Sequence, residues 1–204
     1  LHIAAIHGHV DHVALLLDRG VNLNIRDEYG LTALERAIVE RRADVALLLM
    51  LCGADHSSIV QAKGVLEKTL STKLEKTLED YKETNTIVKD LDAVFNSRSP
   101  GESPLHLAIK LHNGYSQNKK PSLLKSAKLA VLLLSKTDQL HSADTAGNTP
   151  LHLAALLGDL SSARILIKNG ADLEAENNEE ATPESLAIEG GSLAMRQFLD
   201  AFNI

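Results

Sequence analysis

The stretch that decides the fold is Thr-Pro-Leu-His-Leu-Ala-Ala at residues 149–155. A close copy, Ser-Pro-Leu-His-Leu-Ala-Ile, stands at residues 103–109, and the chain opens with a shortened copy, Leu-His-Ile-Ala-Ala, at residues 1–5. Weaker copies occupy residues 32–38 and 182–188, and the copies at 149–155 and 182–188 begin 33 residues apart. Self-similarity at a fixed period indicates a chain of stacked structural repeats.

The chemistry of one period predicts two short helices. Residues 144–148 form a turn whose glycine is free to take a positive φ, Thr149 can cap the following helix, and Pro150 suits its first position. A second helix should carry the Ile-Leu-Ile triplet at 165–167 and end at Gly170, since glycine commonly follows the last helical residue. Each period is therefore expected to be a helix–turn–helix unit followed by a loop.

The bulk composition agrees with thin stacked helices. The 204 residues are 44% hydrophobic with only three Phe, three Tyr and no Trp, so the chain can bury a substantial core with small side chains that let repeats approach closely. The formal net charge of −6 gives no reason to expect a nucleic-acid partner, and no apolar run reaches the ~18 residues of a membrane span. The single cysteine, Cys52, excludes an internal disulfide framework and fits a reducing compartment.

A helix–turn–helix unit that recurs every 33 residues around Thr-Pro-Leu-His resembles the ankyrin repeat. The resemblance implies an all-α solenoid of about five repeats, which in this family is a protein-binding surface without cofactor or catalytic activity. Repeats one and two are expected at residues 1–57, with the first truncated, and repeats three to five at residues 98–204. Residues 177–204 are more polar and are expected to form a C-terminal cap. Because the chain starts inside a repeat and without Met, we expect it to be part of a longer protein.

Two segments depart from the period. Residues 58–97 keep a helical apolar spacing and repeat Leu-Glu-Lys-Thr-Leu at 66–70 and 74–78, which predicts an amphipathic helical insertion. It either folds back on the repeats, or is a decayed repeat, or is an exposed helix that serves a partner or a second copy. If it folds back over part of the binding face, residues 58–96 would act as a lid or autoinhibitor. Residues 113–121 are rich in turn formers and predict a loop insertion within repeat three, which is either functional or simply solvated.

The resemblance places the binding surface on the turn tips and on the exposed face of each first helix. The partner-binding residues expected from it are Tyr29, Leu31, Val39, Glu40, Lys110, Leu111, Asn148, Leu156, Leu157 and Glu189. Large apolar groups at nominally exposed positions indicate a hot spot, and these are Tyr29, Leu111, Leu156 and Leu157. Charge is uneven too: residues 103–137 hold six lysines and no acid, whereas residues 169–195 hold seven acids and no Lys or Arg. This polarity either steers a partner or belongs to ordinary solvated faces.

Residue types with reactive chemistry are present but badly placed for it. The histidine shared by His2, His106 and His152 is structural in the ankyrin family, where it bonds backbone groups of neighbouring loops. The His-x-His-x-x-His motif at residues 7–12 could resemble a ligand cluster, yet its members should belong to different helices. Cys52 has no histidine at a catalytic spacing. We therefore expect no catalytic residue, no metal site and no cofactor.

One modification is implied by the resemblance alone. Asn24 ends the loop after repeat one, eight residues after Leu16, where the family's asparagine can be hydroxylated by an oxygen-dependent asparaginyl hydroxylase. The acidic residue that often precedes it is replaced here by Asn22. The alternative role of Asn24 is that of a structural turn residue.

The function expected from the sequence is protein–protein recognition by a monomer in the cytoplasm, with the nucleus as a second possible location. An alternative from another class is the substrate-selecting module of a larger enzyme, or of an effector secreted by an intracellular bacterium into the host cytosol. The partner is expected to be a protein, and the sequence does not name it.

Overall fold

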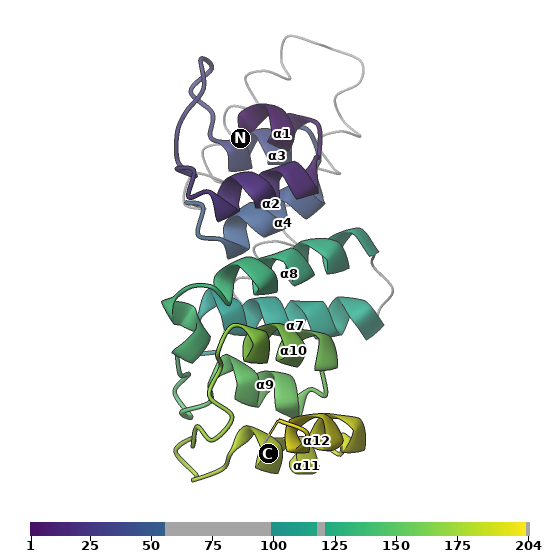
Figure 1. The fold of residues 1–204 in the computed structure, drawn as a ribbon. Coiled ribbons are helices and arrows are strands. Elements are labelled where there is room, and N and C mark those ends of the chain that lie inside the picture. The colour runs from purple at the N-terminus through teal and green to yellow at the C-terminus, as the bar shows by residue number, and fades with distance from the viewer. Residues whose placement is uncertain (56–98, 118–120, 203–204) are drawn as a thin grey trace. The chain divides into compact units, whose positions relative to one another are not determined.

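The computed structural model describes residues 1–55, 99–117 and 121–202. These residues form α-helices joined by turns, with one short 3-10 helix and no strand among them (Figure 1). The chain divides into two compact units, Leu1–Arg98 and Ser99–Ile204, which are described one at a time. The helical insertion expected at 58–97 lies outside the described residues.

The first unit consists of two helical hairpins that pack against each other. The helix α1 packs beside α3, and α2 packs beside α4. Apolar side chains of α3 and α4, including Leu34, Ile38 and Leu47, are fully buried. The helices of this unit are α1 (His2–Ile6), α2 (Val10–Asp18), α3 (Ala33–Val39) and α4 (Ala43–Leu51).

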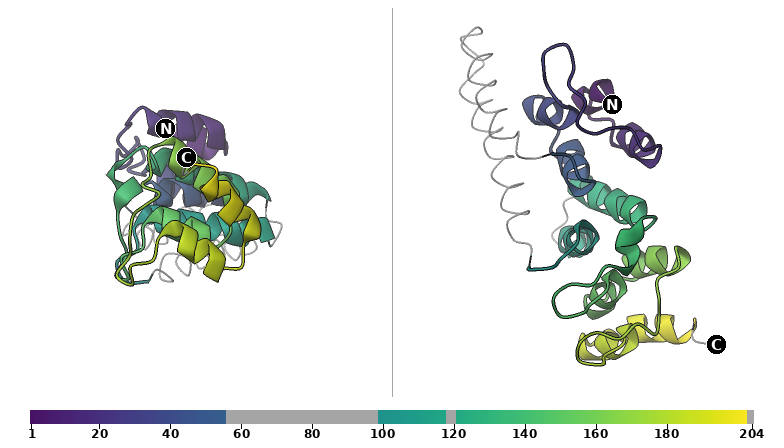
Figure 2. Two further views of the ribbon diagram at one scale, coloured as in Figure 1. Left: turned by 60° about the horizontal axis from the view of Figure 1, so that its bottom comes forward. Right: turned by 90° about the vertical axis from the view of Figure 1, so that its left-hand side faces the viewer.

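The second unit stacks three such hairpins in sequence order (Figure 2). The helix α9 lies between α7 and α11, and α10 lies against α8, so each hairpin packs on its neighbours in the chain. Leu105, Leu151 and Leu166 are fully buried in this stack. Its elements are α7 (Pro104–Gln117), α8 (Pro121–Leu134), the 3-10 helix η1 (Asp138–His141), α9 (Pro150–Leu156), α10 (Leu160–Lys168), α11 (Pro183–Glu189) and α12 (Leu193–Asp200).

The first helix of a repeat begins where the sequence predicts it. The Thr149 hydroxyl caps α9, Pro150 occupies the first turn, and the Thr149 N–H donates to His152 Nδ1 at 3.2 Å. In the first unit Thr32 and Glu35 form the corresponding capping box, in which the Thr32 N–H donates to Glu35 Oε2 at 2.7 Å. Reciprocal bonds of this kind satisfy backbone N–H groups that a helix start otherwise leaves without partners.

The loop insertion expected at residues 113–121 is wrong for most of its length. The helix α7 continues through Gln117 and α8 begins at Pro121, so that both helices have 14 residues against 7 in α9 and 9 in α10. Asn113 and Gly114 are weak helix formers, but packing overrides this preference. His112, on the last turn before them, is buried and bonded to Asp159 at the start of α10.

Candidate partner-binding surfaces

Three turn tips, here called fingers, are each stiffened by one side chain. The first residue of a finger accepts two backbone N–H groups, from the residues two and four positions later, at 2.9–3.0 Å. A fully bonded turn of this kind holds its outermost residue in one place. The fingers are residues 27–31 in the first unit and 144–148 and 177–181 in the second, with Tyr29, Ala146 and Glu179 exposed at their tips.

The shared histidines hold these fingers from below, as expected from the resemblance. His106 Nε2 donates to the Asn148 carbonyl and His152 Nε2 donates to the Ala181 carbonyl, both at 2.9 Å. His2 Nε2 lies 3.0 Å from the carbonyl oxygen of Leu31. Burial lowers the pKa of His106 and of His152 despite their bonds to backbone carbonyls. These side-chain bonds to the carbonyls of the fingers confirm the structural role of the three histidines.

Tyr29 is the most prominent side chain of the finger in the first unit. It is 71% exposed, and the guanidinium carbon of Arg36 lies 4.7 Å from the centroid of its ring. Arg36 is itself anchored, because its Nε donates to Asp27 Oδ2 at 2.6 Å. Burial alone would raise the pKa of Asp27, but the bonds from Arg36 and from backbone N–H groups outweigh it and lower that pKa. The aromatic ring is therefore held outward by a cation–π contact and an ion pair.

The first helices of the repeats in the second unit, α7, α9 and α11, are here called inner helices. They carry a different set of exposed groups. Lys110, Leu156 and Glu189 occupy equivalent positions on α7, α9 and α11, which lie side by side. Leu156 is 37% exposed and Glu189 is exposed, while Lys110 forms an ion pair with the buried Glu102. Leu111 and Leu157 are half-buried. Along this surface, the ion-paired Lys110 is followed by the apolar Leu156 and then by the acidic Glu189.

Two of the expected partner-binding residues are placed differently. Leu31 is only 6% exposed, because it closes the base of its finger, so it offers little to a partner. The Asn148 side chain is half-buried, and its Oδ1 accepts a bond from Asn177 Nδ2 at 2.8 Å, which makes it a link between two fingers. Val39 is half-buried and Glu40 is exposed at the end of α3. The remaining expected residues form one group in each unit. Those of the first unit are Tyr29, Val39 and Glu40, and those of the second are Lys110, Leu111, Leu156, Leu157 and Glu189.

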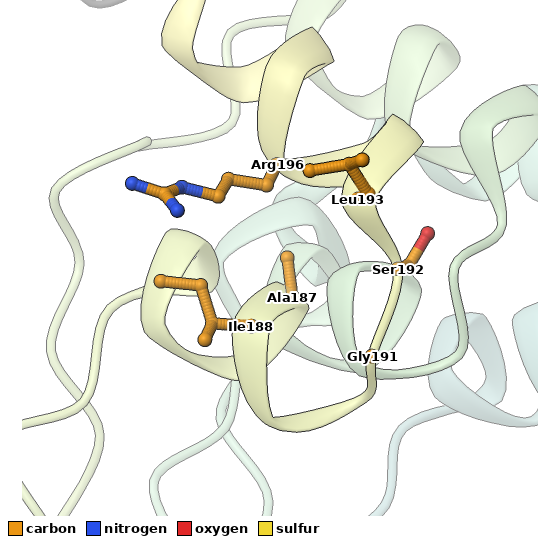
Figure 3. Close-up of a pocket in the computed structure, with 6 residues that line it drawn as sticks. All are labelled: Ala187, Ile188, Gly191, Ser192, Leu193 and Arg196. Carbon is orange, nitrogen blue, oxygen red and sulfur yellow. The ribbon is translucent and has the colours of Figure 1, made fainter.

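An apolar pocket on the last repeat is not among the sites predicted from the sequence. It lies between α11 and α12, with Ile188 54% exposed and Leu193 66% exposed (Figure 3). The signal was present in the period: Ile188 stands where the preceding repeat has Ala155, and Arg196 where it has Ala163. Both alanines are fully buried. The pocket is lined by Ala187, Ile188, Gly191, Ser192, Leu193 and Arg196.

One buried cluster has the residue types of a hydrolytic triad but not its hydrogen-bond arrangement. It consists of His112, Asp159 and Ser162. His112 Nδ1 and Ser162 Oγ both bond the same oxygen, Asp159 Oδ2, at 2.6 Å. Burial raises the pKa of Asp159, yet the bonds from His112 and Ser162 outweigh it, so that pKa is lowered. Because the serine hydroxyl donates to the carboxylate and all three side chains are buried, no activated nucleophile results. The cluster ties α7 to the start of α10.

Cys52 and the histidines at residues 7–12 also lack the arrangement that catalysis or metal binding requires, among the residues that the structure describes. Burial raises the pKa of the Cys52 thiol to about 12, so it stays protonated at neutral pH. The rings of His7, His9 and His12 lie 5.8 and 5.4 Å apart in sequence order, and no three metal-ligating side chains converge among the described residues. Asn24 Oδ1 accepts the Asp55 N–H at 3.0 Å, which gives Asn24 a structural bond between consecutive loops. No described helix is long and apolar enough to cross a membrane.

Family models match two parts of the chain. Residues 1–59 match a model described as ankyrin repeats in three copies, and residues 146–178 match the single ankyrin repeat. E3 ubiquitin-protein ligase KEG of Arabidopsis thaliana is 23% identical over 194 residues, covering 94% of this chain and 12% of that protein. Neurogenic locus notch homolog protein 1 of Homo sapiens is 28% identical over 187 residues, covering 92% of this chain and 5% of that protein.

A shorter match is more similar. The transient receptor potential cation channel subfamily A member 1 homolog of Caenorhabditis elegans is 43% identical over 58 residues, which are 28% of this chain and 5% of that protein. The chain therefore spans only 5% to 12% of the length of these three relatives.

Proposed function

Because this chain is an ankyrin-repeat protein, we propose that it binds a partner protein through its fingers and the exposed faces of its inner helices. Ankyrin repeats are non-catalytic interaction modules, and the braced fingers support this role. A surface whose turns and caps are already fully bonded loses little conformational freedom on binding.

The observation that carries the proposal is the placement of Tyr29. A large aromatic side chain that is mostly exposed gains more from burial in an interface than any other group on its finger. Arg36 and Asp27 hold the ring in place before a partner arrives. Tyrosine is also among the residues that most often dominate the free energy of protein–protein binding.

The alternative, in which the chain selects substrates for an enzyme, has less support. The relatives bear the names of a ubiquitin ligase, a Notch homolog and a cation channel, so no single activity accompanies the shared repeats. Protein recognition by the repeats does not depend on the activity of the rest of a protein that carries them, so it fits relatives of such different kinds.

We further propose that the chain acts without turnover, as a monomer in the cytoplasm or nucleus.

The test compares two single substitutions of exposed side chains within the first unit. The intact chain, Tyr29→Ala and Leu15→Ala are used to capture partners from a cell lysate, with quantitative mass spectrometry as the readout. Leu15 is the matched control because it is an exposed leucine that belongs to α2 and not to the finger. We expect Tyr29→Ala to lose at least ~10-fold of a specific partner and Leu15→Ala to keep it. Equal capture by both variants would contradict the proposed site.

A further inference from the structure

The inner surface of the second unit brings an apolar centre directly against an acidic edge. Leu156 ends α9, and Gly190 follows Glu189 at the end of α11. A side chain at Gly190 would collide with the Leu156 carbonyl oxygen, so these two helix ends touch. The exposed Leu156 side chain and the exposed Glu189 side chain therefore lie on adjoining helix ends of neighbouring repeats.

Two further carboxylates stand on the finger of the same repeat. Glu179 and Glu180 are exposed, and the finger that carries them is fixed to the preceding one. The Asn178 N–H donates to the Ala146 carbonyl at 3.0 Å, and Asn178 Nδ2 donates to the Thr145 carbonyl at 3.1 Å. The acidic finger thus keeps a fixed position relative to the repeat that contributes Leu156.

The charges of this surface do not cancel internally. Lys110 is compensated by the buried Glu102, whereas no described Lys or Arg side chain forms an ion pair with Glu179, Glu180 or Glu189. Arg196 on α12 is engaged with Glu184 at 3.7 Å and with Asp200 at 4.0 Å. Residues 169–195 contain no Lys or Arg of their own. The missing positive charge must therefore come from outside this surface if it is to be complemented.

We infer that the partner segment bound by the second unit places an apolar side chain on Leu156 and Leu157 and a lysine or arginine beside Glu189, with a further cation near Glu179, which stands before the opposite end of α11. This inference rests on the proposed function and adds the chemistry and direction of the partner to it. Exposed ion pairs alone bind weakly, so the apolar contact holds the segment while the cation sets its orientation along the repeats. The expected occupant is a short protein segment that combines both residue types.

The experiment selects partners without assuming their identity. A random dodecapeptide library displayed on phage is panned against the intact 204-residue chain and against Glu179→Lys/Glu189→Lys. We expect the intact chain to enrich peptides in which Lys or Arg accompanies an apolar residue, and the charge-reversed variant to lose them. Leu156→Ser should weaken an enriched synthetic peptide by about fivefold or more, whereas Leu132→Ser, a comparably exposed leucine on α8, should leave its affinity unchanged.

The outcomes separate this inference from the proposed function. Binders that depend on Leu156 but carry no cation would overturn the inference and leave partner recognition standing. Binders unaffected by all of these substitutions would also overturn it, because the occupied surface would then lie elsewhere. A failure to enrich any peptide over a column without protein would count against both. Melting temperatures of the variants, which alter only exposed side chains, show that each is folded.

Discussion

At the scale of single residues, His106 and His152 make the second unit sensitive to acid. Burial lowers the pKa of both imidazoles in the folded chain, so unfolding raises each pKa toward its ordinary value of ~6.5. The stabilisation is therefore complete above about pH 6.5 and is lost as the pH falls through the lower folded-state values. We expect the urea concentration at the midpoint of unfolding to decrease when the pH is lowered from about 7.5 to about 5. His106→Gln/His152→Gln should reduce this dependence, and His141→Gln, at an exposed histidine, should not.

Leu166 tests the register of the second unit. Its side chain is fully buried on α10, so Leu166→Ala should lower the free energy of unfolding by about 2–5 kcal/mol through a cavity in the stack. The matched control is Leu132→Ala, because Leu132 is 40% exposed on α8 and should lose much less. Chemical denaturation measures both. Equal losses would mean that the outward and inward faces of these helices are wrongly assigned.

At the scale of elements, the fingers of the second unit depend on a close backbone approach. Gly147 and Gly170 both have a positive φ, of 79° and 92°. A Cβ at Gly147 would lie 2.7 Å from the Asn178 nitrogen, whereas a Cβ at Gly170 meets nothing within 4 Å. Gly147→Ala should therefore cost about 1–3 kcal/mol more than Gly170→Ala, since both incur the backbone strain and only one displaces a neighbour. Thermal unfolding of the two variants, if indistinguishable, would argue against the contact between fingers.

Some features of the helices and fingers could be predicted from the sequence, and others could not. The caps, the turn glycine and the histidine brace follow from local chemistry and the repeat resemblance, so Thr149 and His152 could be assigned from the 33-residue period. The continuation of α7 through Gln117 could not, because local propensity favours a turn, whereas the packing of α7 on α8 and the bond from His112 to Asp159 are tertiary contacts. The burial of Leu31 likewise depends on how a finger closes on its own base.

At the scale of the whole molecule, the net charge of −6 is unevenly distributed, with an acidic excess in residues 169–195, which include Glu179 and Glu189. Seven acidic residues and no Lys or Arg between 169 and 195 create a field that attracts a cationic segment before contact. Salt screens this attraction over about 10 Å at 0.1 M ionic strength but leaves the apolar contact with Leu156 nearly unchanged.

The association rate constant of an enriched cationic peptide should therefore fall about tenfold between roughly 50 and 500 mM salt, while its dissociation rate constant changes much less. Stopped-flow fluorescence measures both constants. The variant Glu179→Gln/Glu189→Gln should show a weaker salt dependence, and Glu28→Gln, which removes a carboxylate from the finger of the first unit, should behave like the intact chain. An association rate constant that is independent of salt, with all of the change in dissociation, would mean that these carboxylates act only after the partner is bound and do not steer it.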